Sequence, residues 1–225
     1  MIELSDITLV NVNCLDVKTA VKSLRFSSKS ITFKCATAFS SICPLEYLTE
    51  QEKKTNYYKW VQIKPILTLS DYNRFMLIEL VNYINTEHCL VIQNDGFVIN
   101  PHLWNNVFKE YDYIGAPWSM YGMKVWSRTN RIGNGGFSLR SLKLLNHLKD
   151  VHQKTPFDFT EAEDVTISKI IEKGIFKYPD IGTACRFSQE CPIEDYPFDL
   201  TKSFGFHGTM IYNNLHTLCP SVFKV

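Results

Sequence analysis

The sequence predicts an α/β fold: one domain with a mixed, mostly parallel sheet and helices on both faces. Segments of strand composition alternate along the chain with segments of helical periodicity, which is the pattern of strands joined by helical crossovers. The chain has 225 residues, of which 45% are hydrophobic and 21% charged, and this suits a single three-layer core. No repeat, low-complexity tract or Gly/Ser/Pro-rich linker divides it. We therefore expect one domain over residues 1–225.

The first elements predict a parallel βαβ unit. Residues 7–12 are apolar and β-branched, which is typical of a strand, and residues 31–39 have a similar composition. Between them, a helix is expected to begin over residues 16–23, because its apolar positions recur at helical spacing through Leu24. A strand, a helix and a strand in this order imply a right-handed crossover in a parallel sheet.

The middle of the chain alternates in the same way. From Ser70 to Ile84, apolar residues at 3.6-residue spacing predict a helix, and a short apolar strand follows over residues 89–93. Residues 101–109 predict a short helix with a proline near its start. A strand over residues 111–115 and a polar, aromatic loop over residues 116–131 complete this part.

Two helices are predicted after that loop. Residues 138–149 place four leucines on one face, and residues 161–173 form the next helix, which Gly174 would end. Beyond Tyr178, three prolines predict an irregular chain.

Composition excludes several classes of protein. A net charge of +1 provides no long-range field for nucleic acid or an anionic membrane, and no apolar run is long enough to span a bilayer. The seven cysteines include no Cys-x-x-Cys pair, which argues against a zinc ribbon, and three of them lie in apolar runs. Buried free thiols indicate a reducing compartment, so we expect a cytoplasmic protein. The sequence does not predict its oligomeric state.

Polar residues follow two of the predicted strands where each strand ends. The strand over residues 89–93 stops at Asn94 and Asp95, and the first strand ends at Asn11 and Asn13. Ligands of open α/β sheets bind beyond the carboxyl ends of the strands. Asp95 is therefore a candidate metal ligand, and Asn11, Asn13 and Asn94 are candidate ligand contacts. Asp-Gly is also a common turn dipeptide, so this segment needs support from elsewhere in the chain.

A glycine-rich loop spans residues 131–138, with three glycines in four positions. Without Cβ atoms, Gly135 and Gly136 would let the backbone approach a ligand closely, and the amides could face an anion or a sugar hydroxyl. Arg131 and Asn134 of the same loop are candidate substrate contacts. The spacing matches neither a dinucleotide-binding loop nor a P-loop, and an ordinary flexible turn is the competing interpretation.

Acidic and imidazole side chains further along complete a possible site. Thr160 and Glu163 fit a helix capping box, which leaves the neighbouring Asp164 unexplained. Adjacent carboxylates raise one another's pKa and can leave one of them as a general base. His207, between glycines and aromatics, is a core residue or a ligand. With Asp95 it offers one oxygen and one nitrogen, a set compatible with Mn²⁺ or Mg²⁺.

Taken together, these segments resemble the nucleotide-sugar-dependent glycosyltransferases of the GT-A fold. The loop over residues 133–138 and the Glu163-Asp164-Val165 segment are similar to those of the fringe and β-1,3-galactosyltransferase group. Residues 93–97 and 111–118 look closer still to an uncharacterised GT-A-like bacterial and viral family. The resemblance covers roughly residues 85–210. It departs from the Asp-x-Asp signature of the wider fold, because Gln93 replaces the first Asp and only Asp95 carries over.

The resemblance implies an inverting glycosyltransferase of glycan biosynthesis. A sugar would pass from a nucleotide diphosphate sugar to a hydroxyl of a glycan or saccharide acceptor, with Asp164 as the base and Glu163 beside it. Mn²⁺ or Mg²⁺ would be held by Asp95 and His207, and Asn11, Asn13 and Asn94 would contact the nucleotide. Trp118 and Trp126 are candidate platforms for the acceptor, with lid and core roles equally open.

Two other functions remain open. A sugar nucleotidyltransferase normally has a Gly-rich, basic loop after its first strand, and residues 11–15 contain neither Gly nor Lys. A non-catalytic domain that binds a sugar or a nucleotide sugar is supported by Gln93 and opposed by the retained Asp164.

Overall fold

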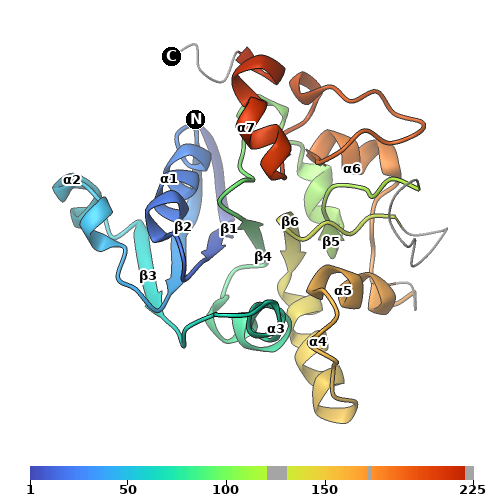
Figure 1. Ribbon diagram of the computed structural model, residues 1–225, viewed down its shortest axis with the longest axis horizontal. Coiled ribbons are helices and arrows are strands. Elements are labelled where there is room, and N and C mark those ends of the chain that lie inside the picture. Colours follow the sequence, from blue (N-terminus) through green and yellow to red (C-terminus); the bar gives the residue numbers. More distant parts are fainter. Residues whose placement is uncertain (121–130, 172–173, 221–225) are drawn as a thin grey trace.

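The computed structural model describes residues 1–120, 131–171 and 174–220 (Figure 1). Within these ranges, a six-stranded sheet has the order β3-β2-β1-β4-β6-β5. β1, β2, β3 and β4 are parallel, and β6 is antiparallel to both β4 and β5. Their bounds are β1 Ile2–Val12, β2 Ile31–Ser40, β3 Tyr58–Gln62, β4 His88–Ile92, β5 Tyr113–Ile114 and β6 Phe137–Ser141. The predicted mixed, mostly parallel sheet is confirmed. β7 (Ser188–Gln189) and β8 (Gly205–Phe206) form a small parallel pair.

Helices cover both faces of the large sheet, as predicted. Their bounds are α1 Val17–Ser27, α2 Glu50–Lys54, α3 Leu69–Arg74, α4 Leu142–Lys154, α5 Glu163–Ile171, α6 Ile181–Phe187 and α7 Thr209–Leu218. Residues of α4, α5 and the segment after α3 share one hydrophobic cluster with β1 and β4, and residues of α1 and α6 share the cluster on the other face. No helix within the described residues is both long enough and apolar enough to cross a lipid bilayer.

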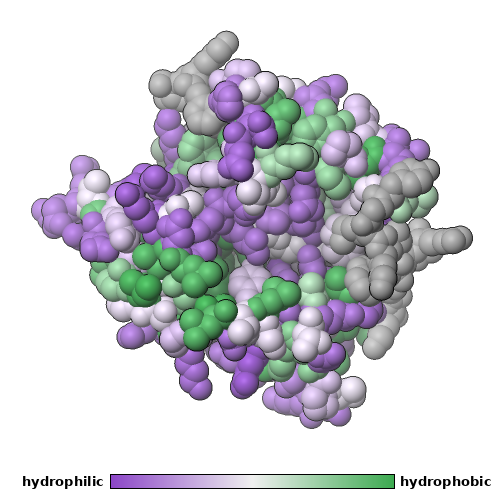
Figure 2. Space-filling model, in the orientation of Figure 1, coloured by the Kyte–Doolittle hydropathy of each residue, from purple (hydrophilic) through white to green (hydrophobic). Residues whose placement is uncertain are grey.

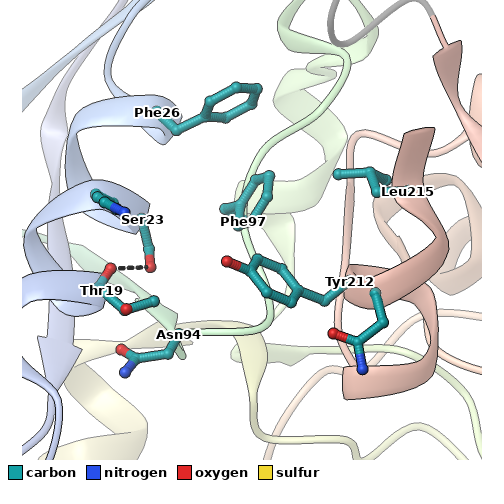
Figure 3. Close-up of a pocket in the computed structure, with 9 residues that line it drawn as sticks. Thr19, Ser23, Phe26, Asn94, Phe97, Tyr212 and Leu215 are labelled. Atoms are coloured by element: carbon teal, nitrogen blue, oxygen red, sulfur yellow. Dashed lines mark hydrogen bonds between the residues drawn. The ribbon is translucent and has the colours of Figure 1, made fainter.

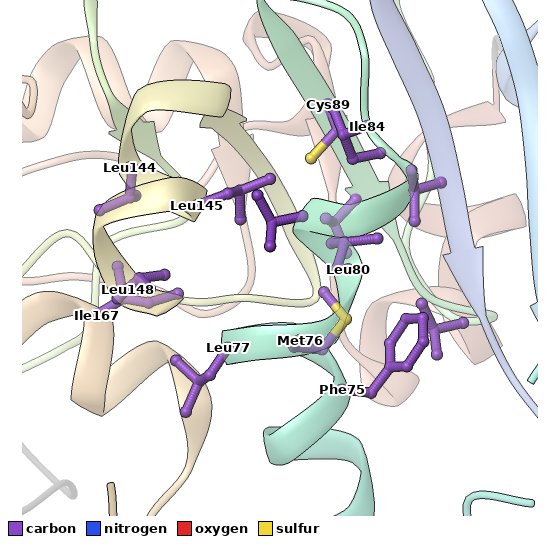
Figure 4. Packing of buried hydrophobic residues seen from close by; sticks show 14 of the residues in the cluster. Phe75, Met76, Leu77, Leu80, Ile84, Cys89, Leu144, Leu145, Leu148 and Ile167 are labelled. Carbon is purple, nitrogen blue, oxygen red and sulfur yellow. The ribbon is translucent and has the colours of Figure 1, made fainter. Parts of the chain in front are cut away.

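The predicted helix after Ser70 is present but changes its winding. α3 begins behind Thr68, whose capping box with Asp71 satisfies the first N–H groups, and continues as a π-helix over Phe75–Glu79 and a 3₁₀-helix over Leu80–Tyr83. The buried face of this segment packs against the leucines of α4 (Figure 4). The helical segment ends at Tyr83, a few residues before β4 begins at His88. Tyr72, in α3, lies beside Gln93, the residue that follows the carboxyl end of β4.

Leu80→Ala tests how much this packing contributes to stability. Leu80 is fully buried between the sheet and α4, so the truncation loses apolar burial and leaves a cavity. We expect the free energy of unfolding, measured by urea titration, to fall by about 2–5 kcal/mol. The same truncation at the partly exposed Leu45 should cost much less, and equal losses would contradict the packing described here.

Three predicted elements differ in part from the structure. Residues 138–141 belong to β6 rather than to a helix, because Leu139 pairs with Leu90 and Ile114 in the sheet, and α4 begins only after Ser141 caps it. Residues 101–109 form two short 3₁₀ turns, Pro101–Leu103 and Asn106–Glu110. The chain beyond Tyr178 contains α6 and α7, so its prolines separate regular elements rather than prevent them.

Candidate functional site

The carboxyl ends of β1 and β4 lie side by side and are joined by asparagine side chains. Asn11 pairs with Ile92 in the parallel ladder, and its Nδ2 donates to Oδ1 of Asn94 at 3.4 Å. Asn94 Nδ2 donates in turn to the carbonyl of Asp16 at 3.1 Å. Asn13 Oδ1 accepts the N–H groups of Leu15 and Asp16, just before α1, at 2.8 and 2.7 Å. The predicted nucleotide contacts thus cluster, and all three also hold the strand ends in place.

Next to them, His207 lies among three oxygen-bearing side chains. Its Nε2 faces Gln93 Oε1 at 3.0 Å and Asp95 Oδ1 at 3.4 Å, while its Nδ1 faces Glu190 Oε1 at 3.2 Å. The hydrogen bond with His207 lowers the pKa of Asp95 to about 2. Burial lowers the pKa of His207, but its hydrogen bonds with Asp95 and Glu190 outweigh burial and raise it to about 9. Asp95 and His207, distant in sequence, therefore form one charged cluster.

Sequence reasoning missed Tyr72 and Glu190, which orient this cluster. Gln93 Nε2 donates to the Tyr72 hydroxyl at 3.0 Å, so the amide oxygen of Gln93 is turned toward His207. Glu190 accepts at its other oxygen from Asn134 Nδ2 at 2.5 Å. No sequence pattern reveals these partners, because Tyr72 occupies an ordinary helix position and Glu190 lies in a segment expected to be irregular.

A cleft of about 400 Å³ opens beside these residues. Its walls are the end of β1, the residues before α3, Tyr72, and the turn from Gln93 to Asp95. Leu15, Leu67 and Leu69 are exposed at its walls. Figure 2 shows apolar side chains gathered on this face beside a band of hydrophilic ones. The cleft thus has a polar floor and a partly apolar wall.

A second crevice, of about 410 Å³, lies between α1 and α7 (Figure 3). Phe26, Phe97 and Leu215 form its apolar end, while Asn94 lies at the other end and is shared with the first cleft. Asp95 lines the first cleft but not this crevice, and Asp164 and His207 line neither. We therefore place the candidate site at the first cleft.

The glycine-rich loop packs between Asp164 and His207. Gly135 N–H donates to Asp164 Oδ2 at 3.1 Å. A Cβ atom on Gly136 would lie 2.1 Å from Nε2 of His207, so only glycine fits there. The Gly136 N–H donates to Asn134 Oδ1 at 3.0 Å, and its carbonyl accepts from Gln93 N–H at 2.9 Å. Two consecutive residues thus connect the segment that carries Asp164 with the cluster around His207.

Gly136→Ala should disturb this arrangement. The added methyl group overlaps the His207 imidazole, so the loop or the ring must move, and overpacking of this kind costs about 1–3 kcal/mol. We expect a lower free energy of unfolding in urea. Gly174→Ala is a control with nothing within 4 Å, although its φ of +80° adds some backbone strain. A Gly136→Ala protein as stable as the wild type would show that His207 does not pack as described.

Asp164 stands at the first turn of α5 beside a buried ion pair. Burial, followed by the neighbouring charge of Glu163, raises the pKa of Asp164 to about 7. Glu163 is only 5% exposed and is paired with Arg140 at 2.8 Å, which indicates a supporting rather than a reacting role. The expected capping box is wrong: Asn73 Oδ1 accepts the Glu163 N–H, while the Thr160 hydroxyl bonds Asp158.

The remaining predicted substrate contacts have little exposed surface. Trp118 is 6% exposed and packs on Gly133, and Arg131 is paired with Glu194 at 2.7 Å and equally buried. These positions fit roles in the core. Trp126 lies outside the described residues.

The donor atoms around His207 nevertheless suit a divalent cation. Within the described ranges, no group of three or more His, Cys, Asp and Glu side chains is arranged to hold a metal ion. Gln93, whose amide oxygen is turned toward His207, would supply a third donor beside Asp95 and His207. Two oxygens and one imidazole nitrogen form a set that Mn²⁺ accepts. Because His207 must lose its Nε2 proton to bind, the affinity for a metal would rise with pH.

The chain was compared with protein families, curated proteins and solved structures. A family model described as a protein of unknown function (DUF5672) matches residues 58–207, more than half of the chain, and no curated protein matches. The active-site mutant Q189E of LgtC is similar with a TM-score of 0.50 and 12% identity, over 90% of this chain and 87% of that one. This similarity confirms the predicted GT-A-like fold.

Two further solved structures match less closely. The glycosyltransferase GlyE of Streptococcus pneumoniae TIGR4 has a TM-score of 0.45 and 16% identity, over 74% of this chain and 43% of that one. TarS 1-349 of S. aureus has a TM-score of 0.43 and 13% identity, over 72% and 53%. The chain spans less than half the length of the GlyE chain that it matches.

Proposed function

We propose, from the premise that the chain belongs to the DUF5672 family and has a GT-A-like fold, that it is an inverting glycosyltransferase. In this proposal, residues 1–225 form one domain that transfers a sugar from a nucleotide diphosphate sugar to a hydroxyl of a glycan acceptor. The acceptor oxygen bonds to the anomeric carbon of the sugar while the bond from that carbon to the diphosphate oxygen breaks. The hydroxyl proton passes to Asp164, and the nucleoside diphosphate leaves.

The observation that carries the proposal is that two consecutive residues, Gly135 and Gly136, contact Asp164 and His207 respectively. Asp164 bonds the first of these residues, and His207 packs on the second. Consecutive Cα atoms are about 3.8 Å apart, so a carboxylate base and a diphosphate-binding cluster flank one peptide unit. A single sugar ring could therefore face both, which an attack from the side opposite the leaving group requires.

The environment of Asp164 supports the role of general base. Its raised pKa, about 7, lies close to neutral pH, where a base combines a large deprotonated fraction with useful proton affinity. Asp164 keeps some exposed surface, from which an acceptor hydroxyl would have to approach it. In this proposal Glu163 does not act as the base, because its carboxylate is buried and paired with the Arg140 guanidinium.

The cleft beside Gln93, Asn94 and Asp95 supports a nucleotide diphosphate donor. It lies beyond the carboxyl ends of β1 and β4, and its polar floor meets an apolar wall against which a nucleobase could pack. Mn²⁺ or Mg²⁺ would be held by Asp95 and His207 with the Gln93 amide oxygen, and when bound would neutralise negative charge on the departing diphosphate. Donor sugar and acceptor are not specified by these contacts.

A panel of nucleotides tests the proposal. We expect one of UDP, GDP and CMP to raise the melting temperature in the presence of Mn²⁺ and to do so much less without it. The matching nucleotide sugar should then be consumed when a saccharide acceptor is added. Stabilisation by free sugar alone would instead support the non-catalytic sugar-binding domain, and release of pyrophosphate from a nucleoside triphosphate would support the nucleotidyltransferase.

A further inference from the structure

Arg140, the fourth residue of β6, is a fully buried cation that contacts the glycine-rich loop. Its guanidinium donates to three groups: Nη2 to Glu163 Oε1 at 2.8 Å and to the Gly135 carbonyl at 3.2 Å, and Nε to Ser138 Oγ at 3.0 Å. Ser138 Oγ also donates to the Gly135 carbonyl, at 2.9 Å. The planar guanidinium thus fixes one carboxylate and one backbone carbonyl at the same time.

These contacts determine the surroundings of Asp164. The Gly135 carbonyl is held from below, and the N–H of the same residue donates to Asp164 Oδ2. The other oxygen, Oδ1, accepts the N–H of Val165 at 2.8 Å. The carboxylate therefore has a fixed orientation that depends on where Gly135 lies.

We propose that Arg140 is a positioning residue, which holds Glu163 and Gly135 in the places that orient the Asp164 carboxylate. The proposal rests on the proposed function, in which Asp164 is the base. Packing alone does not account for Arg140, because replacing a buried ion pair by apolar residues is often neutral or stabilising. Its Nη1 also has no hydrogen-bond partner among the described residues, and an unsatisfied buried donor lowers the free energy of unfolding.

The pKa of Asp164 depends on the charges around it and can therefore be used to test the proposal. Glu163 on its own helix, Arg140 on β6, Tyr72 on α3 and Tyr113 on β5 all interact with it electrostatically. Glu163 raises the pKa of Asp164 and Arg140 lowers it, while the two tyrosines stay neutral because burial raises their pKa values. Removing the charge of Glu163 therefore leaves Arg140 as the dominant charge and should lower the pKa of Asp164.

Glu163→Gln provides the first test, because glutamine can still accept from Arg140. We expect the titration of Asp164, followed by ¹³C NMR of its carboxyl carbon and assigned with Asp164→Asn, to move down by about one pH unit or more, a tenfold change in proton affinity. Glu194→Gln is the matched control, since it alters the other buried Arg–Glu pair, and should leave the titration in place. An unchanged titration in folded Glu163→Gln would overturn the proposal.

Arg140→Lys provides the second test, because lysine keeps the charge but cannot hold Glu163 and Gly135 with one planar group. We expect kcat to fall about tenfold or more with little change in the donor KM. A lower melting temperature with unchanged kcat would mean a purely structural role and would overturn the proposal. The NMR titration needs no turnover, so it separates this inference from the proposed function: an inactive wild type contradicts the function alone.

Discussion

Asp164→Asn should abolish sugar transfer while donor binding remains nearly intact. If Asp164 takes the acceptor proton, the amide removes the base, and loss of a positioned general base costs about 10²–10⁴-fold in rate. Gly135 and Val165, the residues whose N–H groups the Asp164 carboxylate accepts, do not line the donor cleft, so the hydrogen bonds of the cleft residues are not changed directly. Steady-state kcat with the matching nucleotide sugar, and its Kd from calorimetry, measure the two quantities separately.

One structural effect of this substitution has to be controlled. Both oxygens of Asp164 accept backbone N–H groups, from Gly135 and Val165, and an amide offers only one oxygen. A small loss of stability is therefore expected. Asp158→Asn is the matched control, because it makes the same chemical change at an exposed residue close to the same helix. Equal losses of kcat and donor affinity in Asp164→Asn would remove Asp164 from the role of base.

The sequence predicted the elements that carry the donor end of the site. β1, α1, β2 and β4 follow from composition and periodicity, and the parallel order brings the ends of β1 and β4 together. The contact between Asp95 and His207 could not be predicted in the same way. It depends on the β7–β8 pair and α7, which local patterns did not predict because short strands and proline-bounded helices have weak periodicity.

The antiparallel β6 was missed for a physical reason that bears on function. Its five residues, Phe-Ser-Leu-Arg-Ser, precede a leucine-rich helix, and Leu139 falls in phase with the leucines of α4. Arg140 also hides the strand in the sequence, because a charged residue is not expected in a strand that is buried on both faces. Arg140 can be buried because Glu163, the Gly135 carbonyl and Ser138 Oγ accept hydrogen bonds from its Nη2 and Nε. Glu163 lies on α5, which no local sequence pattern connects with β6.

Sequence motifs alone did not predict how deeply the side chains of Trp118 and Arg131 are buried. Both residue types bind sugars and phosphates, yet each side chain here is about 6% exposed and serves the loop itself. Trp118 supports Gly133, and Arg131 pairs with Glu194. Whether such a residue faces a ligand or the core depends on the path of the loop, which its composition does not determine.

Asp95→Ala should weaken nucleotide binding chiefly when Mn²⁺ is present. Its carboxylate, whose pKa is about 2, stays charged at ordinary pH, faces His207 and accepts the Thr209 hydroxyl at 2.8 Å. Without it, only His207 and a neutral amide remain as metal donors. We expect the Mn²⁺-dependent gain in affinity, measured by calorimetry with and without Mn²⁺, to fall about tenfold or more. Asp150→Ala, at an exposed position on α4, should behave as the wild type. An equal loss with and without Mn²⁺ would mean that Asp95 acts by holding α7 through Thr209, and that the cluster around His207 is not a metal site.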